Sequence, residues 1–105
     1  MKKHVHVIRD SVTGNTSDLM FVSNVQAFER GIAFQLAKSK IPAAFLRDSA
    51  LYLVGCFDTD SMEFDSCVPT IVWRGDDPDF AKMVKMAFEA LATSASDDPE
   101  AHSAE

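Results

Sequence analysis

The chain is poor in the residues that build specialised small proteins. Of its 105 residues, only two are cysteine, four glycine, one tyrosine and one tryptophan. Two cysteines are too few for a disulfide scaffold. No apolar run approaches the ~20 residues of a membrane span, and charged residues follow the opening Met-Lys-Lys where a signal peptide would be apolar. The sequence therefore predicts a cytoplasmic protein with reduced thiols.

Catalytic and metal-binding signatures are also missing. There is no glycine-rich phosphate loop, no G-x-S-x-G turn and no paired acid on a recognisable helix face, so we expect no enzyme activity. His4, His6, Cys56 and Cys67 could in principle hold zinc, but their spacing matches no zinc motif. We expect no metal and no other cofactor.

The length and the 47% of hydrophobic residues fit a single domain, which we place at residues 1–94. Residues 95–105 are small, polar and acidic, and are typical of a disordered tail. Such a tail could compete with nucleic acid for a basic surface, recruit a partner protein, or simply keep the chain soluble.

Alternating residues predict an opening strand from His4 to Arg9, with Val5 and Val7 on one face and the histidines on the other. A polar loop follows. Residues 51–58 are almost continuously apolar and predict a central strand, and residues 62–67 predict its hairpin partner. Pro69 favours an edge position or a bend, before a short further strand over residues 70–73.

Two helices are expected. Ser23 and Gln26 form a capping box for the first, which runs to about Lys40 before Pro42. Residues 42–48 favour one short helical turn. Asp77 caps the second helix, with Pro78 at its first position. The order strand, helix, strand, strand, short strand, helix predicts an α+β fold, with two helices on a mostly antiparallel sheet of three to four strands.

The first helix carries two apolar stripes. One contains Val25, Phe28, Ile32 and Leu36, and the other, nearly opposite, contains Ala27, Gly31 and Phe34. A helix that packs on one surface does not need the second stripe. We therefore expect Ala27, Gly31 and Phe34 to form a homodimer interface. The alternative is a helix buried wholly within its own domain.

Charge is unevenly distributed although the net charge is −6. Residues 1–47 hold seven basic and three acidic residues, whereas residues 48–80 hold one basic and eight acidic residues. Single-stranded DNA proteins combine a positive groove with aromatic faces on which bases stack. The amino-terminal half supplies the charge, and rings near the sheet come from Phe45, Tyr52, Phe57, Phe64 and Trp73, most of them expected in the core.

Several motifs resemble the small nonstructural proteins of gokushoviruses, which are single-stranded DNA phages of the Microviridae. Residues 51–58 are similar to that family's Leu-Tyr-x-x-Gly-x-Phe-Asp strand, and residues 7–10 to its opening strand. Residues 27–32 echo its helix loosely, and Pro69 fits a proline after the hairpin. The chain departs from the family at Ser61-Met62, where Thr-Gly is frequent, and at residues 46–48, where Pro-Glu-Asp is common.

The resemblance implies a viral accessory protein in the host cytoplasm that binds DNA and promotes the switch from duplex replication to single-stranded genome synthesis. We expect a homodimer that binds single-stranded DNA non-specifically, with viral replication proteins as further partners. The basic residues expected on phosphates are Lys2, Lys3, Arg9, Arg30, Lys38, Lys40 and Arg47, and the rings expected to stack are Phe45 and Tyr52. The alternative is a module that binds a viral or host protein without contacting DNA.

Overall fold

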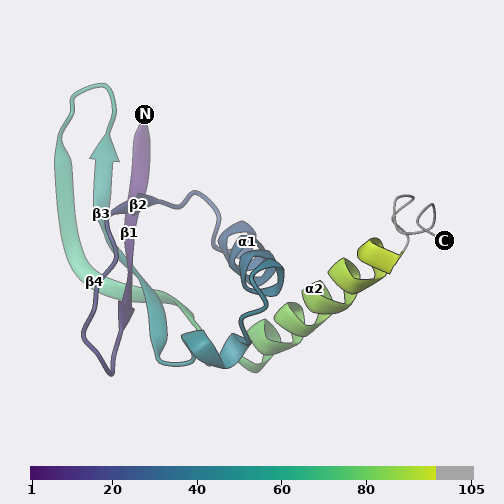
Figure 1. Ribbon diagram of the computed structural model, residues 1–105. Helices are drawn as coiled ribbons and strands as arrows, with labels where there is room; N and C mark the ends of the chain where they lie inside the picture. Colours follow the sequence, from purple (N-terminus) through teal and green to yellow (C-terminus); the bar gives the residue numbers. More distant parts are fainter. Residues whose placement is uncertain (97–105) are drawn as a thin grey trace.

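The computed structural model describes residues 1–96, which form one four-stranded sheet, two α-helices and one 3-10 turn (Figure 1). In chain order the elements are β1 (Lys2–Asp10), β2 (Met20–Phe21), α1 (Val25–Lys38), η1 (Ala43–Leu46), β3 (Ser49–Asp58), β4 (Phe64–Arg74) and α2 (Pro78–Ser96). The sheet order is β2-β1-β3-β4 and every pairing is antiparallel. The predicted α+β class is confirmed, as is the predicted turn at η1.

The order of the elements differs from the prediction in two places. A two-residue strand, β2, pairs with β1 before the first helix, where only a loop was expected. Residues 70–73 are not a separate strand, because β4 runs continuously from Phe64 to Arg74. A two-residue strand leaves no alternating pattern in the sequence, which explains why β2 was missed.

β4 is an edge strand, as Pro69 predicted. Between the pairs Leu53–Thr70 and Gly55–Ser66, β4 carries more residues than β3, so the register shifts there. Pro69 lies in this irregular stretch. Because proline has no N–H to donate to a strand ladder, an irregular edge is where a sheet tolerates it.

Helix α1 is capped by a residue other than the predicted one. The Asn24 side chain accepts a hydrogen bond from the Ala27 amide at 3.1 Å, and Asn24 has extended backbone angles. Ser23 is therefore not the cap, although serine and asparagine cap equally well in general. At the other end Lys40 has a positive φ of 58°, which turns the chain toward Pro42.

Helix α2 begins as predicted. Asp77 lies before Pro78, and its carboxylate accepts a hydrogen bond from the Asp79 amide at 2.9 Å. The helix continues to Ser96, two residues past the predicted end of the domain at residue 94. Residues 97–105 of the predicted tail lie outside the described residues.

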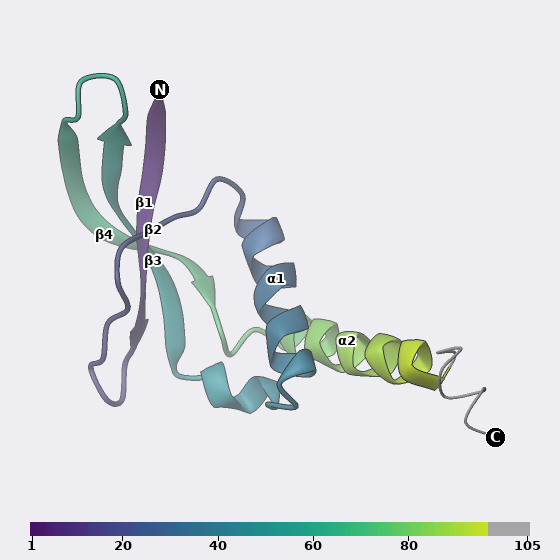
Figure 2. The same ribbon diagram turned by 45° about the horizontal axis from the view of Figure 1, so that its top comes forward.

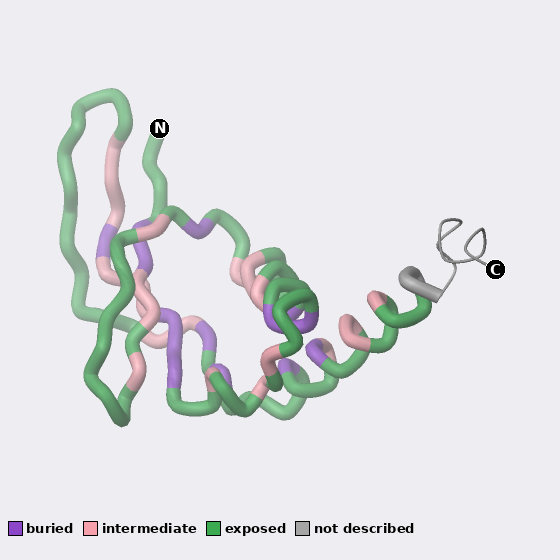
Figure 3. Tube along the Cα trace, in the orientation of Figure 1, coloured by how far each residue is buried: buried purple, intermediate pink, exposed green. Residues whose placement is uncertain are grey.

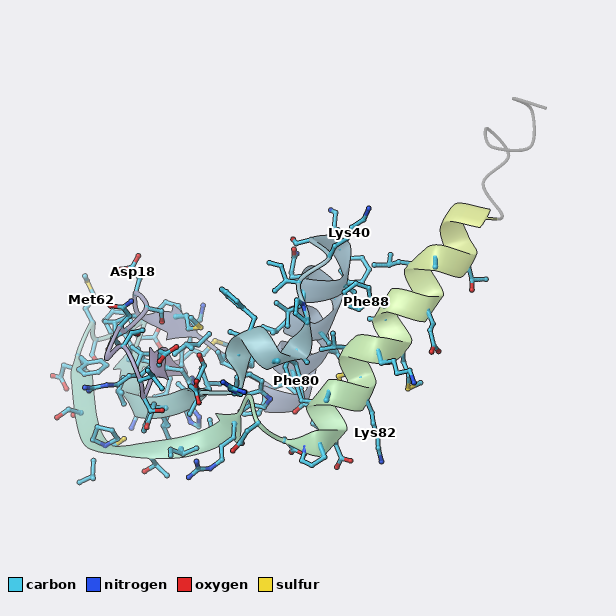
Figure 4. All side chains as sticks on the ribbon, turned by 60° about the horizontal axis from the view of Figure 1, so that its bottom comes forward. Asp18, Lys40, Met62, Phe80, Lys82 and Phe88 are labelled. Atoms are coloured by element: carbon cyan, nitrogen blue, oxygen red, sulfur yellow. The ribbon has the colours of Figure 1, made fainter. Side chains whose placement is uncertain are left out.

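The core lies between the sheet and the two helices. Leu51 and Phe80 are fully buried, and the Trp73 ring packs edge-on against Phe80 and Phe28, with centroids 5.0 and 5.7 Å apart. Figure 4 shows Phe80 and Phe88 on the side of α2 that faces α1, and Lys82 on the opposite side. The predicted core stripe of the first helix is confirmed, because Val25, Phe28, Ile32 and Leu36 all belong to this cluster or pack against it.

The molecule is elongated, with extents of 59 × 34 × 20 Å and a radius of gyration of 17.3 Å. A compact domain of this length has a radius of gyration of about 13 Å. Both helices lie beside one half of the sheet, and the half with the β3–β4 turn extends past them (Figures 1 and 2). Figure 3 shows that β4 and the β3–β4 turn are exposed in the half of the sheet that extends past the helices.

Within residues 1–96, no helix is long and apolar enough to cross a membrane.

His6 is the buried titratable group of the sheet. It is 3% exposed, it pairs with Leu53 and Met20 on the neighbouring strands, and its Nδ1 has no hydrogen-bond partner among the described residues. Burial lowers the pKa of His6 below its ordinary value of 6.5, because the protonated ring loses its hydration. The fold therefore holds His6 in its neutral form.

We expect Phe80→Ala to lower the free energy of unfolding by about 3–5 kcal/mol, since it leaves a cavity beneath Trp73. Phe45→Ala is the matched control, because Phe45 is 69% exposed, and it should change stability by less than about 0.5 kcal/mol. Urea denaturation followed by circular dichroism measures both. Equal losses in the two variants would contradict the described core.

We also expect stability to fall as the pH drops from 7.5 to 5.5. The unfolded chain protonates His6 near pH 6.5, whereas the folded chain resists protonation, so the unfolded state binds more protons below that pH. His6→Gln should remove this dependence, and His4→Gln, at an exposed position, should keep it. Urea midpoints at several pH values test the point. A dependence that survives in His6→Gln would assign it to another group.

Candidate nucleic-acid interface

The strand register assigns each paired residue to one face of the sheet. Directly paired residues share a face, and successive residues alternate between the faces. Ile8, Leu51 and Trp73 are partners across β1, β3 and β4, and all three pack into the core beneath the helices. Between the pairs Val5–Gly55 and His6–Leu53, β3 carries one extra residue, so the faces are followed through the pairs rather than by counting.

The face opposite the helices, called the open face below, is defined by the remaining pairs. Its members include the pairs Lys3–Phe57–Phe64, Val5–Gly55–Ser66, Val7–Tyr52–Ile71 and Arg9–Ala50–Arg74, with Phe21 beside Val5. Val5 and Val7 lie here, and His4, His6 and Ile8 lie on the helix side, as the alternation predicted.

The open face has the opposite charge to the chain as a whole. Its paired positions hold three cations, Lys3, Arg9 and Arg74, and no carboxylate, although the net charge is −6. The paired positions on the helix side hold Lys2 together with Asp10, Asp58 and Asp65. Because side chains alternate across a strand, neighbouring acidic and basic residues are placed on opposite faces.

Arg9 and Arg74 lie on either side of Ala50, at one end of the open face. Two strand spacings separate them, which is about 10 Å. Both are exposed, and in the described part of the chain neither lies within ion-pair distance of a carboxylate. Ala50 between them is only 7% exposed, and an anion that reaches both guanidinium groups would accept charge-assisted hydrogen bonds from each.

The polypeptide beside Arg9 is held by the Asp10 carboxylate. It accepts hydrogen bonds from the amides of Val12 and Thr13 at 2.8 and 2.9 Å. These bonds, with that from Thr13 the larger cause, lower the pKa of Asp10. The bonded loop then returns along β1, where Thr16 pairs with Arg9. Asp10 thus orders the loop from the helix side while Arg9 stays on the open face.

Aromatic rings lie at the other end of the open face. The Phe21 and Phe57 centroids are 6.3 Å apart, and the Lys3 ammonium lies 5.5 Å from the Phe21 ring. The Phe64 ring crosses Gly55, because a Cβ added there would lie 2.5 Å from its Cζ. Gly55 therefore lets Phe64 lie flat against the sheet.

Tyr52 lies between the arginine end and the aromatic end of the open face. It is half-buried between Val7 and Ile71 at the middle of the open face. Lys3 and Arg9 are six residues apart on one strand, a distance of about 20 Å. Cations, rings and an apolar middle thus follow one another along the face, the combination that single-stranded nucleic acids bind.

The structure brings together three of the residues expected to bind DNA, Lys3, Arg9 and Tyr52. Lys2 lies on the helix-side face but joins Lys3 and Phe21 in lining a cleft of about 460 Å³ at the edge of β1. The other expected contacts lie outside the paired positions of the open face: Arg30 and Lys38 on α1, Lys40 after it, and Phe45 and Arg47 at η1. The basic amino-terminal half therefore does not form one continuous surface.

Two groups on the open face were not expected from the sequence. Arg74 lies in the acidic part of the chain, where averaging over residues 48–80 concealed it. Phe21 lies in the segment expected to be a loop. Most of the rings near the sheet were expected in the core; of these rings, Trp73 is buried and Phe64 is 46% exposed.

The stripe expected to form a dimer interface is exposed on α1. Ala27, Gly31 and Phe34 are all accessible, with Phe34 47% exposed, and a Cβ added at Gly31 would meet no atom within 4 Å. The stripe thus lies away from the core, and the alternative of a helix buried on all sides does not apply.

Metal ligands are not gathered anywhere in residues 1–96, since no group of three or more His, Cys, Asp or Glu residues is placed to hold an ion.

A family model described as "Phage ORF5 protein" matches residues 3–77, which include β2, α1, η1, β3, β4 and all of β1 except its first residue. No curated protein and no solved structure matches the chain.

Proposed function

The chain belongs to the phage ORF5 protein family, and from that premise we propose that it binds single-stranded DNA on the open face of its sheet. One observation carries the proposal: a chain of net charge −6 has one sheet face with three cations, four aromatic rings and no carboxylate at its paired positions. The four rings are those of Phe21, Tyr52, Phe57 and Phe64.

The charge distribution answers the main physical objection to this function. Affinity for nucleic acid comes largely from releasing counterions at phosphates, so non-specific binders are usually basic overall. Here the local surface matters more than the total, because at physiological ionic strength charges further away than about 8 Å are largely screened. Arg9, Arg74 and Lys3 would contact phosphates, and the rings would stack on bases.

The resemblance to the gokushovirus nonstructural proteins supports a finer proposal. The protein would act in the host cytoplasm during phage genome replication, where it would hold displaced single strands and favour single-stranded genome synthesis. Viral replication proteins are proposed as further partners. No catalytic role is proposed, because binding alone is sufficient for this task.

We expect Arg9→Glu plus Arg74→Glu to weaken binding of a labelled single-stranded oligonucleotide at least tenfold. The slope of log affinity against log salt should decrease by about 1.4, since each phosphate contact on a single strand contributes about 0.7. Fluorescence anisotropy over a series of salt concentrations measures both quantities.

Arg30→Glu plus Lys38→Glu is the matched control, because it makes the same change in net charge on α1, away from the open face. Binding should stay within about twofold of wild type. If only this variant lost affinity, the DNA would lie on α1. If the wild-type protein gave no anisotropy change at low salt, a protein-binding module would be the function instead.

We propose a homodimer formed through Ala27, Gly31 and Phe34. Phe34→Glu should convert a species of twice the 11.5 kDa chain mass into a monomer, because it places a charge in an apolar contact. Light scattering after size exclusion measures the mass. Phe45→Glu, at an exposed position on η1, should leave the dimer intact. A monomeric wild-type protein would refute this interface.

A further inference from the structure

A small apolar pocket lies at the aromatic end of the open face. Its volume is about 140 Å³, and its lining residues are Val5, Leu19, Met20, Phe21, Phe57 and Phe64. All six side chains are apolar, so the walls offer no side-chain hydrogen bond to an occupant. The pocket is formed between β2 and the ends of β3 and β4 that extend past the helices.

The floor of the pocket is buried, and its rim is accessible to solvent. Val5 is 4% exposed, whereas Leu19 and Phe21 at the rim are 67% and 60% exposed. The Phe64 ring forms part of the pocket wall and lies directly over Gly55, where only glycine fits beneath it. An apolar cavity of about 150 Å³ holds a benzene ring, so this pocket accommodates one planar ring.

The surroundings of the pocket indicate the chemistry of its occupant. The Lys3 ammonium lies 5.5 Å from the Phe21 ring at the rim, and no paired position of the open face carries a carboxylate. A planar ring with apolar faces, joined to an anion, satisfies both features. An apolar side chain of a protein partner would satisfy the pocket but not the cation.

We propose that the pocket takes one unstacked nucleobase of a bound single strand, with Lys3 contacting the phosphate next to it. The inference rests on the proposed function and adds a defined base subsite to it. Because the lining side chains form no hydrogen bonds, the subsite recognises a ring rather than a base sequence. Because its volume fits one six-membered ring, a pyrimidine enters it more readily than a two-ring purine.

The test compares two single-stranded probes of equal length and charge: oligo-dT, and an oligonucleotide that is abasic at every position. Wild-type protein should prefer oligo-dT, since stacking of one base on aromatic side chains contributes about 5- to 150-fold in affinity. Phe21→Ala should reduce that preference by about fivefold or more, the contribution of one stacked base, while retaining the salt dependence of binding. Thermal unfolding checks that the variant is folded, which is expected because Phe21 is largely exposed.

Met86→Ala is the control, because Met86 is an exposed apolar side chain on α2 with 68% of its surface accessible. It should keep the full preference for oligo-dT. A Lys3→Gln variant should lose affinity for both probes alike, because its contact is with phosphate. An equal loss of preference in Met86→Ala and Phe21→Ala would overturn the assignment of the pocket.

The outcomes distinguish this inference from the function on which it rests. Equal, salt-dependent binding of both probes by wild-type protein would overturn the base subsite and leave DNA binding intact. Absence of binding to either probe would overturn the proposed function as well. If Phe21→Ala altered the mass of the protein in light scattering without changing probe preference, the pocket would hold a second copy, and the nucleobase would be excluded.

Discussion

The contact among Trp73, Leu51 and Phe80 determines the rest of the structure. Leu51 and Phe80 are fully buried, and the Trp73 ring packs edge-on against Phe80. This contact attaches both helices to the same face of the sheet, since α1 packs on α2 and joins the same cluster. A domain of this size has apolar residues enough for one core. Neither α1 nor α2 covers the second face, and its exposed side chains define what the protein presents to its surroundings.

The strand alternation then separates the charges. Arg9 and Asp10 are adjacent in sequence, yet Arg9 lies on the open face, and Asp10 organises the following loop from the helix side. In the same way Phe57 and Asp58 occupy opposite faces. A chain with an acidic total can therefore carry a basic surface without any segment being strongly basic. The charge of this surface follows from the alternation of side chains along the strands rather than from the composition of the chain.

The sequence predicted the elements whose patterns are local. The alternation of residues 4–9, the apolar run at residues 51–58 and the cap at Asp77 all identified real elements. The features that the sequence could not reveal depend on which strands pair with one another. β2 exists because β1 offers it an edge, and Arg74 belongs to the open face because Ala50 is its partner. For the same reason the sequence could not separate Lys3, Arg9 and Tyr52, which share the open face, from residues of α1 and η1 that lie elsewhere.

The irregular edge strand β4 affects how copies of the protein can pack at high concentration. An exposed, flat, regular edge strand is a template onto which other chains can add. β4 instead shifts register twice against β3 and places Pro69 in its irregular stretch, so its outer edge lacks a continuous row of donors. Many copies brought to high local concentration can thus lie next to one another without their sheets fusing.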